Sequence, residues 1–170
     1  MTTSRRFWLR LPAARTRILP PGARAEPGFS ALCIRCSRCA EICPYGTLVP
    51  AGWDHGVDAG IPVVRARETP CYLCMLCPPV CPTGALEPIT DRAKVRMGHA
   101  VVDESTCYAF QGILCRTCID ECPLGDRAIF QNGALEPIVA EGCVGCGICE
   151  RFCPAADSAI TIRPHEAVAA

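Results

Sequence analysis

The sequence predicts a small α+β fold in which short strands and short helices surround cysteine-rich loops. Three observations favour this class: cysteine blocks recur four times, short β-like runs separate them, and aromatic residues are scarce. The 16 cysteines of the 170-residue chain make up about 9% of it, a share typical of a cysteine scaffold. Because aromatic residues are only 6%, side-chain packing would form a thin core, and we expect the cysteines to hold the fold together.

Four blocks contain every cysteine of the chain. Three of them have the spacing C-x2-C-x2-C-x3-C-P, with a proline after the fourth cysteine. The third block extends the first gap to seven residues, YAFQGIL, and keeps the rest of the spacing. In chain order the blocks are Cys33, Cys36, Cys39 and Cys43; Cys71, Cys74, Cys77 and Cys81; Cys107, Cys115, Cys118 and Cys122; and Cys143, Cys146, Cys149 and Cys153.

The spacing distinguishes three uses of cysteine. Two-residue gaps in series give poor disulfide geometry, because neighbouring cysteines crowd one tight loop. Structural zinc prefers two C-x2-C pairs separated by a longer stretch, which is a different pattern. The run C-x2-C-x2-C-x3-C-P is the bacterial ferredoxin signature, in which three thiolates bind one [4Fe–4S] cluster and the fourth binds its neighbour. We therefore expect all sixteen cysteines to ligate four [4Fe–4S] clusters; if Cys107 were not a ligand, its cluster would be a three-iron form.

Short β-like runs lie between the blocks, at residues 62–66, 99–103, 137–140 and 159–163. CPTGAL, at residues 81–86, predicts a short helix after a fourth cysteine. Strand, cluster loop and helix are the unit of a dicluster ferredoxin. Four blocks therefore predict two pseudo-symmetric bacterial dicluster ferredoxin-like modules.

Residues 1–30 differ from the rest of the chain. They contain six arginines, no acidic residue before Glu26, and four prolines that disfavour a long helix. We expect an extended basic arm over residues 1–30, a four-cluster domain over residues 31–164 and a tail over residues 165–170. The stretch SRRFWLR at residues 4–10 resembles a twin-arginine export motif that lacks the apolar region expected after it, and an ordinary basic segment explains it equally well. Such an arm would contact anionic lipid headgroups or a partner protein.

The net charge and the residues outside the cysteine blocks limit the functions that the chain could have. The formal net charge is +0 with neutral thiols, and each oxidised cluster with its four thiolates would contribute about −2. The histidines lie far apart in the sequence, and no nucleophile–base pair or phosphate-binding glycine loop stands out. We expect an electron carrier subunit rather than an enzyme, with no catalytic residue, no small-molecule substrate and no nucleic acid partner. No stretch approaches the ~20 apolar residues of a transmembrane helix.

Sequences beside the cysteine blocks resemble the NapG/MauM ferredoxin-type family over roughly residues 19–164. The resemblance rests on PPGA at residues 20–23, RMGHAV at residues 96–101, the extended third block, and CVGCGICERFCP at residues 143–154. It implies a four-cluster protein that works with a membrane-bound NapH-like quinol dehydrogenase and passes electrons to a downstream redox protein. It also implies the periplasmic face of the inner membrane, whereas the incomplete export signal taken at face value implies the cytoplasm.

Two modules can exchange fourth cysteines sequentially or in a nested order. Similarity to related four-cluster electron-transfer subunits favours the nested order. The expected ligand sets are then Cys33, Cys36 and Cys39 with Cys153; Cys143, Cys146 and Cys149 with Cys43; Cys71, Cys74 and Cys77 with Cys122; and Cys107, Cys115 and Cys118 with Cys81.

Three functions remain open from the sequence. The first is an electron relay beside a membrane quinol dehydrogenase. The second is a soluble cytoplasmic polyferredoxin, which the incomplete export signal favours. The third is a maturation factor that donates electrons or clusters to a metalloenzyme, as in a methylamine dehydrogenase-like system, which the MauM side of the resemblance favours.

Overall fold

Short elements joined by long loops make up the fold, in agreement with the predicted α+β class. The computed structural model describes residues 17–165. The helices are α1 (Gly28–Leu32), α2 (Arg38–Glu41), α3 (Thr117–Asp120) and α4 (Ile148–Phe152). The strands are β1 (Leu48–Pro50), β2 (Pro62–Val64), β3 (Gly98–Val102), β4 (Ile129–Gln131), β5 (Pro137–Val139) and β6 (Ile160–Pro164). No helix among the described residues is long and apolar enough to cross a bilayer.

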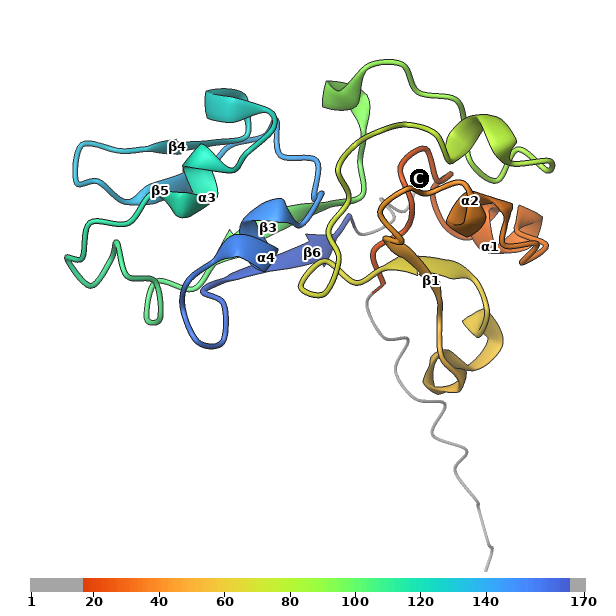
Figure 1. Ribbon diagram of the computed structural model, residues 1–170, viewed down its shortest axis with the longest axis horizontal. Helices are drawn as coiled ribbons and strands as arrows, with labels where there is room; N and C mark the ends of the chain where they lie inside the picture. Colours follow the sequence, from red (N-terminus) through yellow and green to blue (C-terminus); the bar gives the residue numbers. More distant parts are fainter. Residues whose placement is uncertain (1–16, 166–170) are drawn as a thin grey trace, which may run out of the picture.

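The strands form antiparallel pairs rather than one continuous sheet. β1 pairs with β2, β3 with β6, and β4 with β5. In Figure 1, α1, α2 and β1 lie on one side of the molecule, α3, β4 and β5 lie on the other, and β3, α4 and β6 lie between them. The pseudo-symmetry of the two halves stays a prediction.

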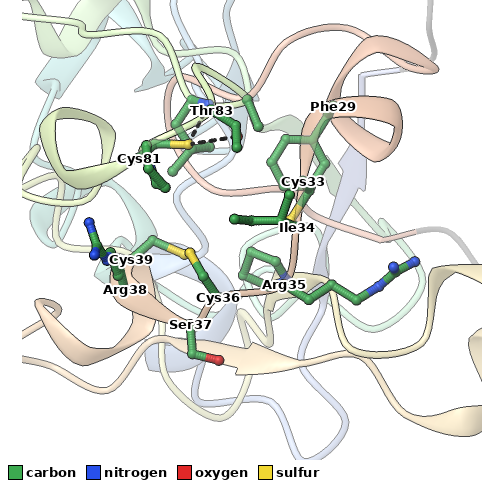
Figure 2. Close-up of a pocket in the computed structure, with 14 residues that line it drawn as sticks. Phe29, Cys33, Ile34, Arg35, Cys36, Ser37, Arg38, Cys39, Cys81 and Thr83 are labelled. Atoms are coloured by element: carbon green, nitrogen blue, oxygen red, sulfur yellow. Dashed lines mark hydrogen bonds between the residues drawn. The ribbon is translucent and has the colours of Figure 1, made fainter.

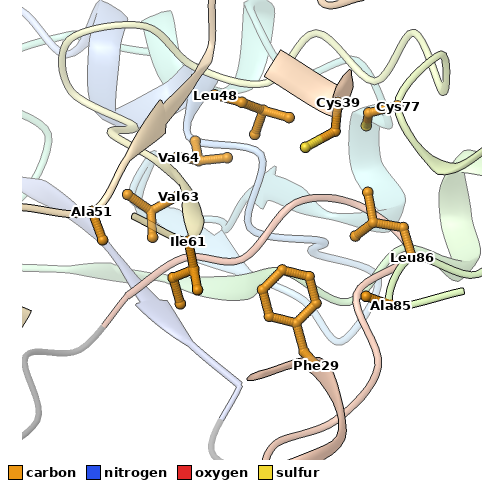
Figure 3. Close-up of a cluster of buried hydrophobic side chains, with 10 residues drawn as sticks. All are labelled: Phe29, Cys39, Leu48, Ala51, Ile61, Val63, Val64, Cys77, Ala85 and Leu86. Carbon is orange, nitrogen blue, oxygen red and sulfur yellow. The ribbon is translucent and has the colours of Figure 1, made fainter. Parts of the chain in front are cut away.

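Phe29 of α1 anchors the core of the amino-terminal half. Its side chain is 1% exposed and lies in one buried cluster with Ile61, Val63 and Leu86, so that α1 shares a core with β2 (Figure 3). Full burial of such an aromatic side chain contributes roughly 1.5–3 kcal/mol. Cysteine thiols belong to the same cluster of buried side chains, so this core is built partly from the cysteine blocks.

Residues 17–30 pack against this half and do not form an extended arm. Val64 N donates a hydrogen bond to the Ile18 carbonyl at 2.8 Å, and Arg17 pairs with Glu26 and Asp58. The predicted boundary at residue 30 falls inside α1. The predicted extended arm is wrong for residues 17–30, which belong to the folded part of the chain. The reason is that acidic side chains neutralise Arg17 while Ile18 and Phe29 bury apolar surface. The export-like motif at residues 4–10 and most of the predicted tail lie outside the described residues.

All four predicted strands are present, as β2, β3, β5 and β6, within two residues of their expected bounds. The predicted helix at residues 81–86 is wrong, because this segment is a turn in which Gly84 has a φ of +69°. α2, α3 and α4 each contain the third cysteine of a block and end before the fourth. The x3 spacer therefore forms the helical turn that was expected after the block.

Candidate metal centres

The sixteen cysteines lie in four groups, each with three cysteines from one block and the fourth from another. Shared cavities define sets I, II and IV, and the electrostatic contacts of Cys118 with its neighbours define set III. Set I contains Cys33, Cys36, Cys39 and Cys81; set II contains Cys71, Cys74, Cys77 and Cys43; set III contains Cys107, Cys115, Cys118 and Cys153; set IV contains Cys143, Cys146, Cys149 and Cys122.

The pairing is sequential, and the nested order expected from related subunits is wrong. Blocks one and two exchange their fourth cysteines, as do blocks three and four. Figure 2 shows Cys81 facing the loop that carries Cys33, Cys36 and Cys39, where the nested order would have put Cys153. The same sixteen cysteines are used in both orders, so only their distribution among the sets changes.

Hydrogen bonds next to the fourth cysteines explain this pairing in the amino-terminal half. Thr47, four residues after Cys43, donates from its hydroxyl to the Pro70 carbonyl at 2.9 Å, immediately before block two. Glu87 N donates to the Gly22 carbonyl at 2.7 Å, which holds the segment after Cys81 beside the segment before block one. Each fourth cysteine is thus placed at the other block of its own half.

Two equivalent hydrogen bonds act in the carboxy-terminal half. Ala140 N donates to the Ala128 carbonyl at 2.9 Å, which places the end of block three beside block four. Asp103 N donates to the Ala159 carbonyl at 2.7 Å, which extends the β3–β6 pair to the region of Cys153. From here on, residues 18–86 are called the amino-terminal module and residues 98–164 the carboxy-terminal module.

Three of the cysteine loops share an alternating backbone conformation. The residue before the second cysteine and the residue after it both have positive φ: Arg35 and Ser37, Leu73 and Met75, and Gly145 and Gly147. Successive amides in such alternating conformations point toward one side and form a concave site for negative charge. These loops can therefore direct N–H groups at an anionic cluster, and only block four uses glycine to do so.

Left-handed backbone strain in block one can be tested at Ser37, which has a φ of +61° and makes no side-chain capping hydrogen bond. Ser37→Gly is expected to stabilise the loop by up to about 1 kcal/mol, because glycine adopts this conformation without steric cost. Ser37→Val is expected to destabilise it by about 1 kcal/mol or more. The measurement is the guanidinium midpoint of cluster loss under anaerobic conditions, with Ser37→Ala as the control. Shifts of the same sign for Gly and Val would contradict the assignment of strain to this residue.

Backbone amides donate to the sulfur atoms of several cysteines. Ala100 N on β3 lies 3.4 Å from Cys143 Sγ, Ala159 N lies 3.3 Å from Cys153 Sγ, and Leu86 N lies 3.5 Å from Cys81 Sγ. Burial would raise the pKa of Cys81, but the amide of Leu86 and the other donors outweigh it, so this pKa lies below its ordinary value. Hydrogen bonds to cluster ligands stabilise negative charge on sulfur and so tune the reduction potential.

Six of the twelve cysteines in the loops have the opposite shift. Burial disfavours the thiolate and raises the pKa of Cys71 and Cys118 to about 12 and that of Cys39 and Cys146 to about 11. Thiols this hard to ionise lose their protons when iron supplies compensating positive charge. Cluster insertion is therefore coupled to proton release and to folding.

The extended loop of block three still delivers its first cysteine to the set. Cys107 is 7% exposed and is one of the residues that raise the pKa of Cys118. Tyr108 and Phe110 pack against the buried cluster that contains Cys107, which supports a role of this loop in shielding set III from water. The position of Cys107 favours a four-ligand set over the three-iron alternative.

The sets fit a cofactor larger than one ion. No three His, Cys, Asp or Glu side chains within residues 17–165 converge closely enough to hold a single metal ion. The cavities at sets I, II and IV are each lined by four cysteines, the number of protein ligands that one [4Fe–4S] cluster takes. Apart from the thiols, largely apolar groups line these spaces, as expected around an iron–sulfur cluster.

Sequence reasoning missed two residues that cover set II. Tyr45 and Tyr72 line the same cavity as Cys43 and Cys74, and their ring centroids are 4.5 Å apart. Tyr45 comes two residues after a fourth cysteine and Tyr72 follows a first cysteine. An aromatic residue shortly after the last cysteine of block one, and another directly after the first cysteine of block two, are a signal that could have indicated their contact.

Thiol loops, amide donors and exchanged fourth cysteines define an iron–sulfur electron-transfer protein of the ferredoxin type. Residues 32–85 match the 4Fe-4S dicluster domain, and residues 104–126 and 140–156 match a 4Fe-4S binding domain. The chain is 41% identical over 167 residues to the methylamine utilization ferredoxin-type protein MauM of Methylobacillus flagellatus. This alignment covers 91% of this chain and 71% of the relative. It is 40% identical over 170 residues to the ferredoxin-type protein NapG of Escherichia coli strain K12. This alignment covers 89% of this chain and 72% of the relative. The chain belongs to the NapG/MauM ferredoxin-type family and carries four [4Fe–4S] clusters.

Proposed function

We propose that sets I to IV ligate the four clusters and that the chain relays electrons from a membrane-bound NapH-like quinol dehydrogenase to a downstream redox protein. The observation that carries the proposal is the presence of four complete cysteine sets in one chain of this family. Each bound cluster would supply reversible one-electron chemistry. The chain itself supplies the thiolates, directs amides at sulfur and excludes water through side chains such as Tyr45 and Tyr72.

The relatives support a relay without selecting its acceptor. MauM of Methylobacillus flagellatus and NapG of Escherichia coli are 41% and 40% identical to this chain. Because the two identities are nearly equal, they do not favour one pathway over the other. They favour the property that both kinds of protein share, which is ferredoxin-type electron transfer. The identity of the acceptor therefore has to come from experiment.

We place the protein at the periplasmic face of the inner membrane, in line with the family resemblance. The arginines at positions 5, 6, 10 and 15 would then contact anionic lipid or the partner, each contributing about 1 kcal/mol near an anionic surface. Arg17 differs from them, because its charge is neutralised by Glu26 and Asp58 within the fold.

Reduction by quinol tests the relay. Anaerobically reconstituted protein should contain about 16 iron atoms per chain, at four per cluster. With quinol and membranes that contain the NapH-like partner, we expect bleaching of the cluster absorbance and appearance of the EPR signals of reduced clusters. Membranes without the partner should leave the clusters oxidised.

Two control results would change the assignment. Reduction by quinol without the partner would contradict the relay role, and no reduction with the partner would favour a soluble polyferredoxin or a maturation factor. A chain that lacks residues 2–16 keeps Arg17 and the described fold, so it isolates the contribution of the basic segment. If this truncation leaves binding to partner-free anionic vesicles unchanged at low salt, the segment makes no lipid contact.

A further inference from the structure

The two modules meet at a direct contact between two cysteine loops. Cys71 N, in set II, donates a hydrogen bond to the carbonyl of Cys146, in set IV, at 2.8 Å. Cys71 and Cys146 belong to different modules, and each is a member of its cysteine set. One hydrogen bond therefore links the backbone of a set II cysteine to the backbone of a set IV cysteine.

Apolar side chains surround this contact. Leu73 and Val95 are 0% exposed and Val144 is 1% exposed, and all three belong to one buried cluster together with Cys71 and Cys146. A buried, largely apolar junction excludes water and keeps the surrounding atoms fixed. A fixed, hydrogen-bonded contact is the kind of connection through which electron tunnelling is favoured over a gap filled by mobile solvent.

Contacts inside each module place the other two sets at the ends. Cys39 of set I and Cys77 of set II lie in one buried cluster, and Cys118 of set III and Cys143 of set IV lie in another. Set I is therefore a neighbour of set II, and set III is a neighbour of set IV. Together with the Cys71–Cys146 hydrogen bond, the order in space is I, II, IV, III, which differs from the order of the blocks in the sequence.

Exposure of the loops agrees with this order. Ile34, inside the set I loop, is 64% exposed, and Leu114, beside Cys115 of set III, is 77% exposed. The residue of set IV that corresponds to Ile34 is Val144, 1% exposed, and the residue of set II that corresponds to Leu114 is Leu73, 0% exposed. Tyr72, which corresponds to Ile34 in set II, is 38% exposed. The loops of sets I and III thus face solvent at positions where the inner loops face the other module.

We propose that electrons cross between the modules at the Cys71–Cys146 contact, so that the four clusters form one row whose ends are sets I and III. The inference rests on the proposed function in one respect, that the four sets hold clusters. The step moves one electron from a reduced cluster to an oxidised one, and no bond, proton or co-reactant changes. Donor and acceptor proteins then exchange electrons with sets I and III.

Magnetic coupling between reduced clusters tests the row independently of turnover. The variant Cys33→Ala/Cys36→Ala/Cys107→Ala/Cys115→Ala removes two ligands from each end set, too many for a three-iron cluster to remain, and leaves the cysteines of sets II and IV in place. We expect the two remaining reduced clusters to give a mutually split EPR spectrum, although they belong to different modules. The matched control Cys74→Ala/Cys77→Ala/Cys143→Ala/Cys149→Ala leaves only sets I and III and should give two unsplit signals.

Iron content separates the two possible failures. Each deleted set should lower iron by about four atoms per chain. If iron does not fall in this way, the ligand assignment fails. If iron falls as expected but sets II and IV give unsplit signals, the ligand assignment stands and the row across the modules is overturned.

Variants of one set decide the question if the variants of two sets do not load. Cys33→Ala/Cys36→Ala leaves three clusters, and the row predicts that all of them are coupled because set II still has set IV beside it. Separate modules predict an isolated, unsplit signal from set II in the same variant. Cys74→Ala/Cys77→Ala is the control, because both arrangements predict an isolated signal from set I.

Discussion

Replacing Gly145 with alanine is expected to prevent set IV from forming, with a loss of at least about four iron atoms per chain. Gly145 has a φ of +72°, and an added Cβ would lie 2.4 Å from the backbone N and C atoms of Gly98 on β3. Backbone atoms of a paired strand cannot move aside as a flexible side chain can. The left-handed conformation costs about 1–2 kcal/mol, and the overlap costs about 1–3 kcal/mol more.

Gly112→Ala is the matched control for this prediction. Gly112 has a φ of +79° in the extended loop of block three, but no atom lies within 4 Å of an added Cβ. This variant has the conformational cost without the overlap and should keep its full iron content with a modest loss of stability. Equal iron loss in both variants would show that backbone conformation, and not the contact with β3, limits assembly of the loop.

Replacing Arg17 with methionine is expected to destabilise the amino-terminal module by about 2 kcal/mol. The Arg17 side chain is 13% exposed, and its guanidinium pairs with Glu26 and Asp58 and donates to Ser30 Oγ at 2.9 Å. Burial would raise the pKa of Glu26, but the hydrogen bonds from Arg17 and Ser30 outweigh it and hold this pKa below its ordinary value. Removing Arg17 leaves two partly buried carboxylates without their cation, and unsatisfied groups of this kind cost roughly 1–3 kcal/mol.

Anaerobic guanidinium unfolding, followed by the absorbance of the clusters, measures this effect. Arg65→Met is the control, because Arg65 and Glu68 pair at 3.4 Å with side chains that are 53% and 65% exposed. An exposed pair contributes at most about 1 kcal/mol, so the control should shift the midpoint little. If Arg17→Met shifts it no more than the control does, the segment at residues 17–30 does not depend on this ion pair.

Local spacing was sufficient to predict the strands and the composition of the cysteine loops. Each expected strand is a β-branched run next to a block, and a short run of this kind favours a strand wherever it pairs. β1 and β4 were missed because the apolar run in each, at residues 48–49 and 129–130, is shorter than the roughly four residues that a strand pattern needs. The expected arm was wrong at residues 17–30 because local composition does not show that Glu26 and the distant Asp58 lie beside Arg17.

The sequence by itself determined the class of cofactor and the identity of the cysteines proposed to bind it. Three cysteines two residues apart must share one loop, whatever the rest of the chain does. Only the tertiary structure decided which fourth cysteine completes each set, because that depends on contacts between distant segments, such as Thr47 with Pro70 and Asp103 with Ala159. The same holds for the order of the sets, which depends on the Cys71–Cys146 hydrogen bond across 74 intervening residues of the chain. Cysteine spacing encodes geometry within a loop, whereas hydrogen bonds and packing between loops determine how the clusters are arranged in space.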